Sequence, residues 1–271
     1  AADALTAGAT ADDVFYYKAA GATTTLTITV TGLGPLAAND TGAVNEDATV
    51  TGTGTVSGTG VLGNDDNGGV SYESEDSTLR VTQAKPDGGS YTSVASGGSS
   101  SIVGTYGTLT LYSTGQYSYT PNNTTAQAIT KDATVTETFV YEIKDDADVN
   151  ASTANLVFTI TGVNDDITAV DDTDSLDEGT SVIRDNTSAS SLDYDDTDPD
   201  SGNTYATHQI TAIRLGNSEG SGTAGTIGEP LKGTYGRLTV FADGSYIYQA
   251  NNNILDGSGN RIIAGDTVTD T

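Results

Sequence analysis

The chain repeats itself with a period of about 130 residues, and this duplication constrains its fold more than any other feature. The run GTYGTLTLYSTGQYSYTPNN begins at Gly104 and recurs at Gly233 as GTYGRLTVFADGSYIYQANN. The run TLTITVTGLG begins at Thr25 and recurs at Asn155 as NLVFTITGVN. Two shorter runs keep a similar period, because AAND returns as AVDD and ATVTET returns as DTVTDT. Four such blocks indicate a duplicated structural unit rather than a chance similarity of composition.

The repeat divides the 271 residues into three segments. Residues 37–165 make one complete repeat, and residues 166–271 make a second repeat without its last strands. Residues 1–36 match the C-terminal strands of a repeat that precedes the complete one or is exchanged with it. We therefore predict one complete domain flanked by parts of two others.

Alternating apolar and polar residues predict β-strands within each repeat. Leu109 and Leu111 alternate with polar residues before the turn at 113–116, and Tyr117 and Tyr119 do so after it, which predicts a β-hairpin. Further strands of this kind are predicted at residues 139–143 and 156–160. Short strands separated by turns rich in Gly, Asp and Asn are typical of two packed antiparallel sheets. The predicted fold is all-β, a tandem of antiparallel β-sandwich domains.

The composition excludes several classes of function. The chain carries 37 Asp and Glu residues against 10 Lys and Arg, a formal net charge of -27. This charge disfavours binding to nucleic acid and anionic membranes, and it favours binding of cations. With no Cys and only one His, His208, the chain cannot form thiol nucleophiles, disulfides or the usual zinc sites. We expect no enzyme activity and no catalytic residues, and no apolar run reaches the roughly 18 residues of a membrane span.

The repeated blocks resemble a known family. GTYGTLTLYSTGQYSYTPNN, followed by TVTETFVYEIKDDADVNASTANLVFTITGVND, is similar to the VCBS repeat of large bacterial RTX-type surface adhesins. The resemblance covers nearly the whole chain. It implies tandem cadherin-like or immunoglobulin-like β-sandwiches, an extracellular location on the bacterial cell surface, and calcium binding within an adhesive or structural array. The same module also occurs beside catalytic domains in secreted enzymes.

Three acidic clusters are candidate Ca2+ sites, because Ca2+ takes about six to eight oxygen ligands. The predicted metal ligands are Asp145, Asp146 and Asp148 in one loop, Asn164, Asp165, Asp166, Asp171, Asp172 and Glu178 at the junction between repeats, and Asp196, Asp198 and Asp200 in the second repeat. In a cadherin-like sandwich the late acidic loop and the linker converge, so the resemblance implies that the first two clusters share metal. The alternative is that these residues only form turns and solvate the surface.

A comparison of the two junctions favours a metal site at residues 162–178. At the earlier junction, the acidic loop DDADVN is replaced by AAGA at residues 19–22. The linker GVNDD is replaced there by GLGPL at residues 32–36. Both acidic sets are lost together, as expected for partners in one site. We therefore predict Ca2+ as the cofactor that stiffens the later linker.

Two functions of different classes remain open. The first is a non-catalytic structural segment of an adhesin stalk or surface filament, whose partners are neighbouring repeats or identical subunits arranged head to tail. The second is a carbohydrate- or ligand-binding module for surface glycans, although the lack of Trp leaves it few aromatic platforms. Residues 14–30 match the strands that the second repeat lacks. The chain is therefore either cut from a continuous array or a filament subunit that receives these strands from a neighbour.

Overall fold

The computed structural model contains two compact units, Ala1–Asn164 and Asp165–Thr271, which we call unit 1 and unit 2. It describes residues 5, 8–53, 59–66, 79–145, 150–187, 189, 191–200, 202, 207–217 and 220–271. All regular elements in these ranges are β-strands, which confirms the prediction of an all-β chain. Over the same ranges, a search for a helix long and apolar enough to cross a membrane found none.

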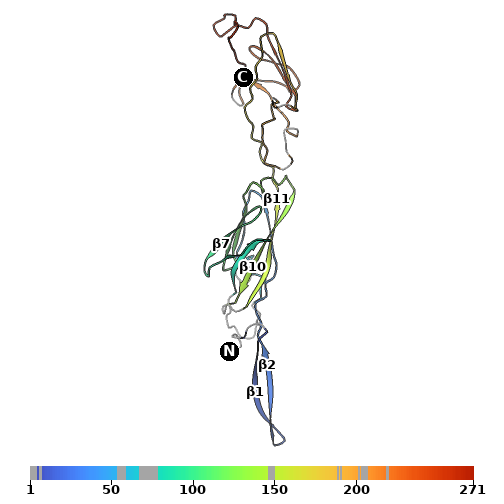
Figure 1. Ribbon diagram of the computed structural model, residues 1–271. Helices are drawn as coiled ribbons and strands as arrows, with labels where there is room; N and C mark the ends of the chain where they lie inside the picture. Colours follow the sequence, from blue (N-terminus) through green and yellow to red (C-terminus); the bar gives the residue numbers. More distant parts are fainter. Residues whose placement is uncertain are drawn as a thin grey trace. The chain divides into compact units, whose positions relative to one another are not determined.

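Unit 1 contains two sheets with a core between them, and Figure 1 labels β7, β10 and β11 of these sheets. The first sheet has the order β3 (Asp40–Asn45), β11 (Ala151–Thr161), β10 (Thr134–Lys144), β5 (Arg80–Pro86) and β6 (Thr92–Ser93). The second has the order β4 (Val50–Gly52), β9 (Tyr117–Pro121), β8 (Gly107–Tyr112) and β7 (Ser99–Val103). The strand pairs are antiparallel except β3 with β11, which is parallel. The prediction of wholly antiparallel sheets was wrong for this pair, because the first strand of the sheet runs beside the last.

Strands β10 and β11 close the core of unit 1. Buried residues alternate along both strands, because successive side chains of a strand point to opposite faces. The Phe158 ring from β11 stacks on Tyr119 of the opposite sheet, with ring centroids 4.2 Å apart. Phe139 from β10 meets the same Tyr119 ring edge-on at 5.7 Å. Aromatic contacts between the two sheets therefore fill the centre of a sandwich-like unit.

A hairpin of two long strands, β1 (Thr10–Ala19) and β2 (Ala22–Thr31), forms a sheet of its own (Figure 1). Its turn contains Ala20 and Gly21, both at positive φ. Among the described strands, β1 and β2 are hydrogen-bonded only to each other. Every residue of both strands is exposed, although several of them are large and apolar. An isolated two-stranded hairpin is at best marginally stable in water.

Within the described residues, unit 2 has fewer and shorter strands than unit 1. One sheet has the order β12 (Ser181–Arg184), β17 (Tyr246–Ala250), β16 (Gly236–Val240) and β15 (Leu231–Lys232), and β13 (Arg214–Leu215) pairs with β14 (Thr223–Ala224). In the β16–β17 hairpin, Leu238 faces Tyr248, as Leu109 faces Tyr119 in the β8–β9 hairpin of unit 1. The two hairpins predicted from the repeat are therefore confirmed. The described part of unit 2 contains no counterpart of β10 or β11.

A cavity of about 760 Å³ lies in unit 2. Its apolar lining includes Leu176, Leu192, Leu238, Tyr246, Tyr248 and Ile254. Leu238 and Tyr248 match Leu109 and Tyr119, which are fully buried in unit 1. Leu109 and Tyr119 therefore lie in the core of unit 1, whereas their counterparts Leu238 and Tyr248 border a cavity in unit 2.

Candidate functional site

Matching hydrogen bonds identify which residues occupy the same place in the two units. The backbone N–H of Ala38 donates to Asp65 Oδ1 over 2.7 Å in unit 1, and that of Val170 donates to Asp196 Oδ1 over 2.8 Å in unit 2. Asp65 and Asp196 are therefore counterparts. The sequence blocks AAND and AVDD likewise make Asp40 the counterpart of Asp172.

In unit 1 the carboxyl groups of Asp40 and Asp65 form a pair beside the hydroxyl of Tyr141 from β10. The hydroxyl oxygen lies 2.8 Å from Asp40 Oδ2 and 3.1 Å from Asp65 Oδ1, and 2.8 Å from the Ala38 carbonyl oxygen. A hydroxyl has one proton, so it cannot satisfy both carboxylates at once. Burial raises the pKa of Asp40 to about 6, and the charge of Asp65 adds to the rise. The pair therefore holds a proton well above the usual pH range of a carboxyl group.

In unit 2 the corresponding pair, Asp172 and Asp196, has more acidic neighbours. Burial raises the pKa of Asp172, and the charges of nearby carboxylates raise it further. The neighbours that act in this way are Asp195, Asp196, Asp193 and Asp171, in order of decreasing effect. The described residues of unit 2 include no tyrosine at the place that Tyr141 occupies in unit 1. Carboxylates that lie close enough together to raise the pKa of Asp172 suit a hard cation such as Ca2+.

Asp193 is the most unusual member of this group, because it takes the place of a core leucine. The turn glycines Gly115 and Gly244 match, and a Cβ on Gly115 would clash with Leu62, whereas one on Gly244 would clash with Asp193. Leu62 is 2% exposed in the apolar core, and Asp193 is 0% exposed. Asp193 Oδ1 accepts a hydrogen bond of 3.1 Å from the Ser191 hydroxyl, while its Oδ2 has no hydrogen-bond partner among the described residues. A buried carboxylate is costly unless a proton or a cation compensates its charge.

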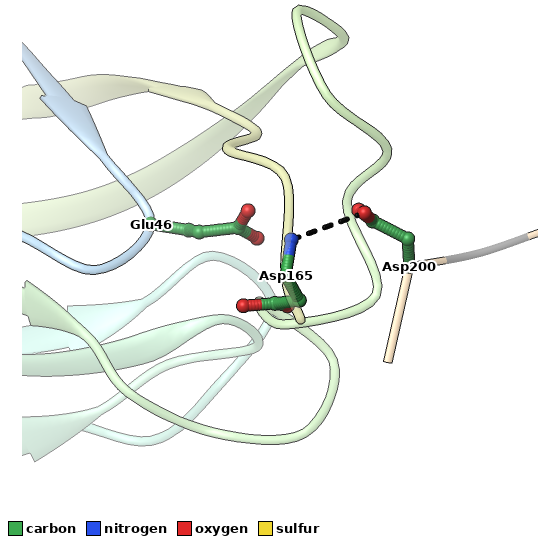
Figure 2. A group of neighbouring side chains, drawn as sticks. All are labelled: Glu46, Asp165 and Asp200. Carbon is green, nitrogen blue, oxygen red and sulfur yellow. Dashed lines mark hydrogen bonds between the residues drawn. The ribbon is translucent and has the colours of Figure 1, made fainter. Parts of the chain in front are cut away.

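The predicted ligands at the start of unit 2 are partly brought together. The backbone N–H of Asp165 donates to Asp200 Oδ2 over 3.2 Å, as Figure 2 shows. The backbone N–H of Asp200 in turn donates to Asp198 Oδ1 over 2.9 Å. Asp200 is only 2% exposed, whereas Asn164 and Asp166 are exposed. These contacts place Asp165, Asp198 and Asp200 in one neighbourhood of unit 2.

Other residues at the end of unit 1 make contacts of their own. Glu46, drawn in Figure 2, is fully buried, and one of its carboxylate oxygens accepts a hydrogen bond from the backbone N–H of Val163. Asp145 is half-buried. The predicted ligands Asp146 and Asp148 lie outside the described residues, so the structure does not test that part of the loop.

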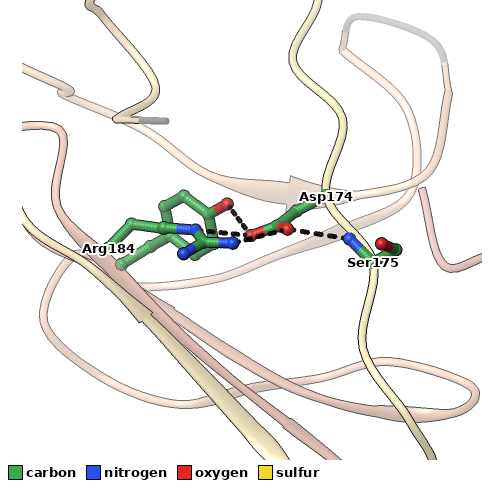
Figure 3. A network of polar contacts seen from close by, with 4 residues as sticks. Asp174, Ser175 and Arg184 are labelled. Atoms are coloured by element: carbon green, nitrogen blue, oxygen red, sulfur yellow. Dashed lines mark hydrogen bonds and ion pairs between the residues drawn. The ribbon is translucent and has the colours of Figure 1, made fainter. Parts of the chain in front are cut away.

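Glu178 and Asp174 contact protein groups rather than the other acidic residues. A Glu178 carboxylate oxygen accepts a 3.2 Å hydrogen bond from the backbone N–H of Ile254, and Arg261 lies 3.7 Å from the other oxygen. Asp174 accepts two hydrogen bonds from Arg184 and one from Tyr246 (Figure 3). These contacts join Glu178 and Asp174 to other parts of unit 2, and the metal-ligand prediction for Glu178 stays a prediction.

A carboxylate clamp at the base of each hairpin was missed by the sequence analysis. In unit 1, Glu137 accepts hydrogen bonds from the backbone N–H groups of Thr105 and Tyr106 and from the Tyr119 hydroxyl. In unit 2, Asp270 accepts from the matching groups of Thr234, Tyr235 and Tyr248. The repeat of ATVTET as DTVTDT carried this signal, because it aligns Glu137 with Asp270.

Comparisons with known proteins add little to this description. No protein-family model and no curated protein sequence matches the chain. One solved structure with a match is an endo-fucoidan hydrolase of glycoside hydrolase family 107, at 10% sequence identity and a TM-score of 0.28. The match covers 92% of this chain and 30% of the hydrolase, so the chain spans less than a third of that enzyme's length. So low a TM-score supports no argument about function.

Proposed function

We propose that the chain is a non-catalytic structural repeat segment of an extracellular bacterial surface protein, part of an adhesin stalk or a surface filament. Its modules are Ig-like or cadherin-like β-sandwiches, and Ca2+ stiffens the linker between them. The observation that carries this proposal is the matched set of contacts in the two units, which includes the β8–β9 and β16–β17 hairpins, the Glu137 and Asp270 clamps, and the Asp65 and Asp196 acceptors. Duplication of a whole structural unit, loops included, is typical of repeat arrays.

Calcium binding is supported by the carboxylates of unit 2 rather than by charge alone. Asp193 is fully buried in place of a leucine, and its negative charge acts on Asp172 together with that of Asp196. A bound divalent cation would compensate these charges and leave the backbone contacts unchanged. Asp165, Asp198 and Asp200 form the second candidate ligand group, at the start of unit 2.

Thermal unfolding of the whole chain with EDTA and with millimolar Ca2+ tests the proposal. Extracellular calcium modules have dissociation constants of about 0.1 to 1 mM. At ten times this constant each site stabilises the folded state by about 1.4 kcal/mol, which raises the melting temperature by about 3 to 11 °C. Coincident melting curves in the two solutions would refute calcium binding.

Substitutions distinguish a specific site from bulk charge. Asp193→Leu restores the residue type found at Leu62, so it should abolish the calcium response of that site and stabilise the calcium-free protein. Asp165→Ala should remove the response of the second group. Asp87→Ala lies in an exposed turn of unit 1 and serves as the charge-matched control. Equal losses in all three variants would indicate bulk charge.

A glycan array with and without Ca2+ tests the carbohydrate-binding alternative.

A further inference from the structure

The two closing strands of unit 1 and the exposed hairpin have the same internal register. In unit 1, Thr134 faces Thr161, Phe139 faces Leu156 and Tyr141 faces Ala154. In the hairpin, Thr10 faces Thr31, Phe15 faces Leu26 and Tyr17 faces Thr24. The alignment of TLTITVTGLG with NLVFTITGVN gives the same correspondence for the second strand. Strands β1 and β2 are therefore the counterparts of β10 and β11.

The burial of these counterparts differs completely. Phe139, Tyr141, Leu156, Phe158 and Ile160 are all 0% exposed in unit 1. Their hairpin counterparts are Phe15 (53% exposed), Tyr17 (51%), Leu26 (50%), Ile28 (47%) and Val30 (37%). These five side chains lie on one face of the hairpin, because alternate residues of a strand share a face. The hairpin thus carries a core-type face with no core against it.

Unit 2 has the complementary deficit. Its described residues include no strands equivalent to β10 and β11, and the cavity of about 760 Å³ is bordered by Leu238, Tyr246 and Tyr248. The matching residues of unit 1 are Leu109, Tyr117 and Tyr119, and β10 and β11 cover them. Phe158 of β11 contacts both tyrosines there. The cavity therefore has the lining that a β10–β11 pair requires.

We propose that unit 2 of one copy binds the β1–β2 hairpin of a second copy, which completes the sandwich. This inference rests on the proposed function, since it requires that the two units are copies of one module. In the 271-residue chain the hairpin and the open unit are different surfaces, so the contact is heterologous and would produce a linear head-to-tail assembly of this chain. Addition of strands to an incomplete sheet also satisfies exposed backbone groups.

Two polar groups specify the register of this contact. Tyr17 occupies the place of Tyr141, so its hydroxyl would lie beside Asp172 and Asp196, as that of Tyr141 lies beside Asp40 and Asp65, and would donate to one of the two carboxylates. Asp13 occupies the place of Glu137, which Asp270 fills in unit 2. Residues 10–14 of the incoming hairpin therefore compete with residues 267–271 for one position. The core-type face of the rest of the hairpin would lie against the cavity lining at Tyr246 and Tyr248.

Sedimentation of the whole 271-residue chain over a wide range of concentrations tests the proposal. We expect a series of multiples of the 27.5 kDa chain that grows with concentration. Leu26→Asp, on the core-type face, should leave only monomer. Thr27→Asp, on the opposite face of the same strand, is the matched control and should assemble normally. The substituted residues lie in the exposed hairpin, so the melting of the two units reports whether either variant misfolds.

A mixing experiment separates this contact from simple association between two hairpins. The Leu26→Asp chain retains an open unit 2, so it accepts a hairpin but donates none. Excess Leu26→Asp chain should therefore shorten wild-type assemblies, whereas excess Thr27→Asp chain should not. If the Leu26→Asp chain stays outside the assemblies and leaves their length unchanged, the hairpins associate with each other and the proposal is wrong.

The tyrosine gives a finer test of the register. Tyr17→Phe should weaken the contact about tenfold, since a hydrogen bond to a charged group is lost. Tyr16→Phe, whose side chain lies on the other face, should leave the affinity unchanged. Equal effects, or a wild-type chain that is monomeric at every concentration, would overturn the proposal. A monomeric chain that still shows the calcium-dependent melting shift would leave the proposed repeat function intact.

Discussion

Units 1 and 2 contain the same hairpin, the same carboxylate clamp and the same acidic pair, yet only unit 1 has a filled core. The β8–β9 hairpin packs its tyrosines against Phe139 and Phe158, while the β16–β17 hairpin places its tyrosines beside a cavity. Local pairing and polar contacts therefore form in both units, with or without the closing strands. What β10 and β11 add is burial, the largest favourable contribution to the stability of such a domain.

The largest expected difference between the units comes from truncating matched tyrosines. Tyr119→Ala removes a fully buried ring and should destabilise unit 1 by about 3 to 5 kcal/mol. Tyr248→Ala removes a half-buried ring that borders the cavity, so the cost to unit 2 should be less than about half of that. Urea unfolding followed by hydrogen exchange in each unit measures both values. Equal losses would mean that unit 2 is as well packed as unit 1.

The second prediction, with a smaller expected effect, concerns the Asp40 and Asp65 pair and the pH dependence of the stability of unit 1. The pKa of Asp40 is about 6 in the folded chain, whereas an unfolded Asp has a pKa of about 3.9. The folded state binds the proton more tightly, so its contribution to stability is complete below about pH 4 and is lost as the pH rises through about 6. Asp40→Asn should remove this part of the pH dependence.

Melting curves of unit 1 between pH 4 and pH 7 measure this effect. The wild-type midpoint should fall over this interval by more than that of the Asp40→Asn chain. Asp47→Asn serves as the control, because Asp47 is exposed and accepts a hydrogen bond from the Gln127 side chain. Parallel curves for wild type and Asp40→Asn would show that the buried pair does not hold the proton.

Much of the fold could be predicted from the sequence because its signals are local. Leu109, Leu111, Tyr117 and Tyr119 alternate over a short turn, and the structure pairs them as that pattern predicts. The parallel pairing of β3 with β11 could not be predicted in this way. It joins segments more than a hundred residues apart, and no periodicity within either segment specifies its neighbour.

The candidate site was less predictable, because residues of the same type in one acidic run have different surroundings in the fold. Asp193 and Asp198 belong to one acidic run, but only Asp193 replaces a core leucine beneath a turn glycine. Glu178, a predicted metal ligand, accepts a hydrogen bond from the backbone N–H of Ile254, a contact that no sequence pattern indicated. A closer alignment of the two repeats would have exposed the Leu62 to Asp193 exchange. The other contacts depend on tertiary packing, which the sequence pattern does not encode.

The smallest expected effect concerns Asp174, whose proton affinity changes in the opposite direction to that of Asp40. Hydrogen bonds from Arg184 are the chief reason that the pKa of Asp174 falls to about 2 (Figure 3). The Tyr246 hydroxyl and the Ser175 backbone N–H contribute further. This stabilisation is complete above about pH 4 and is lost as the pH falls through about 2. Exposed ion pairs contribute little to stability at neutral pH.

Arg184→Ala should therefore raise the pKa of Asp174 toward its ordinary value without changing the melting temperature of unit 2 at pH 7. The pKa should stay below that value, because Tyr246 and Ser175 still donate to the carboxylate. Carboxyl carbon chemical shifts followed from pH 2 to pH 6 measure it directly. Arg261→Ala, which removes the other described arginine–carboxylate contact of unit 2, should leave Asp174 unaffected. If Asp174 titrates at the same pH in the Arg184→Ala chain, its low pKa has another source. The contrast with Asp40 would then not depend on whether an arginine bonds to the carboxylate.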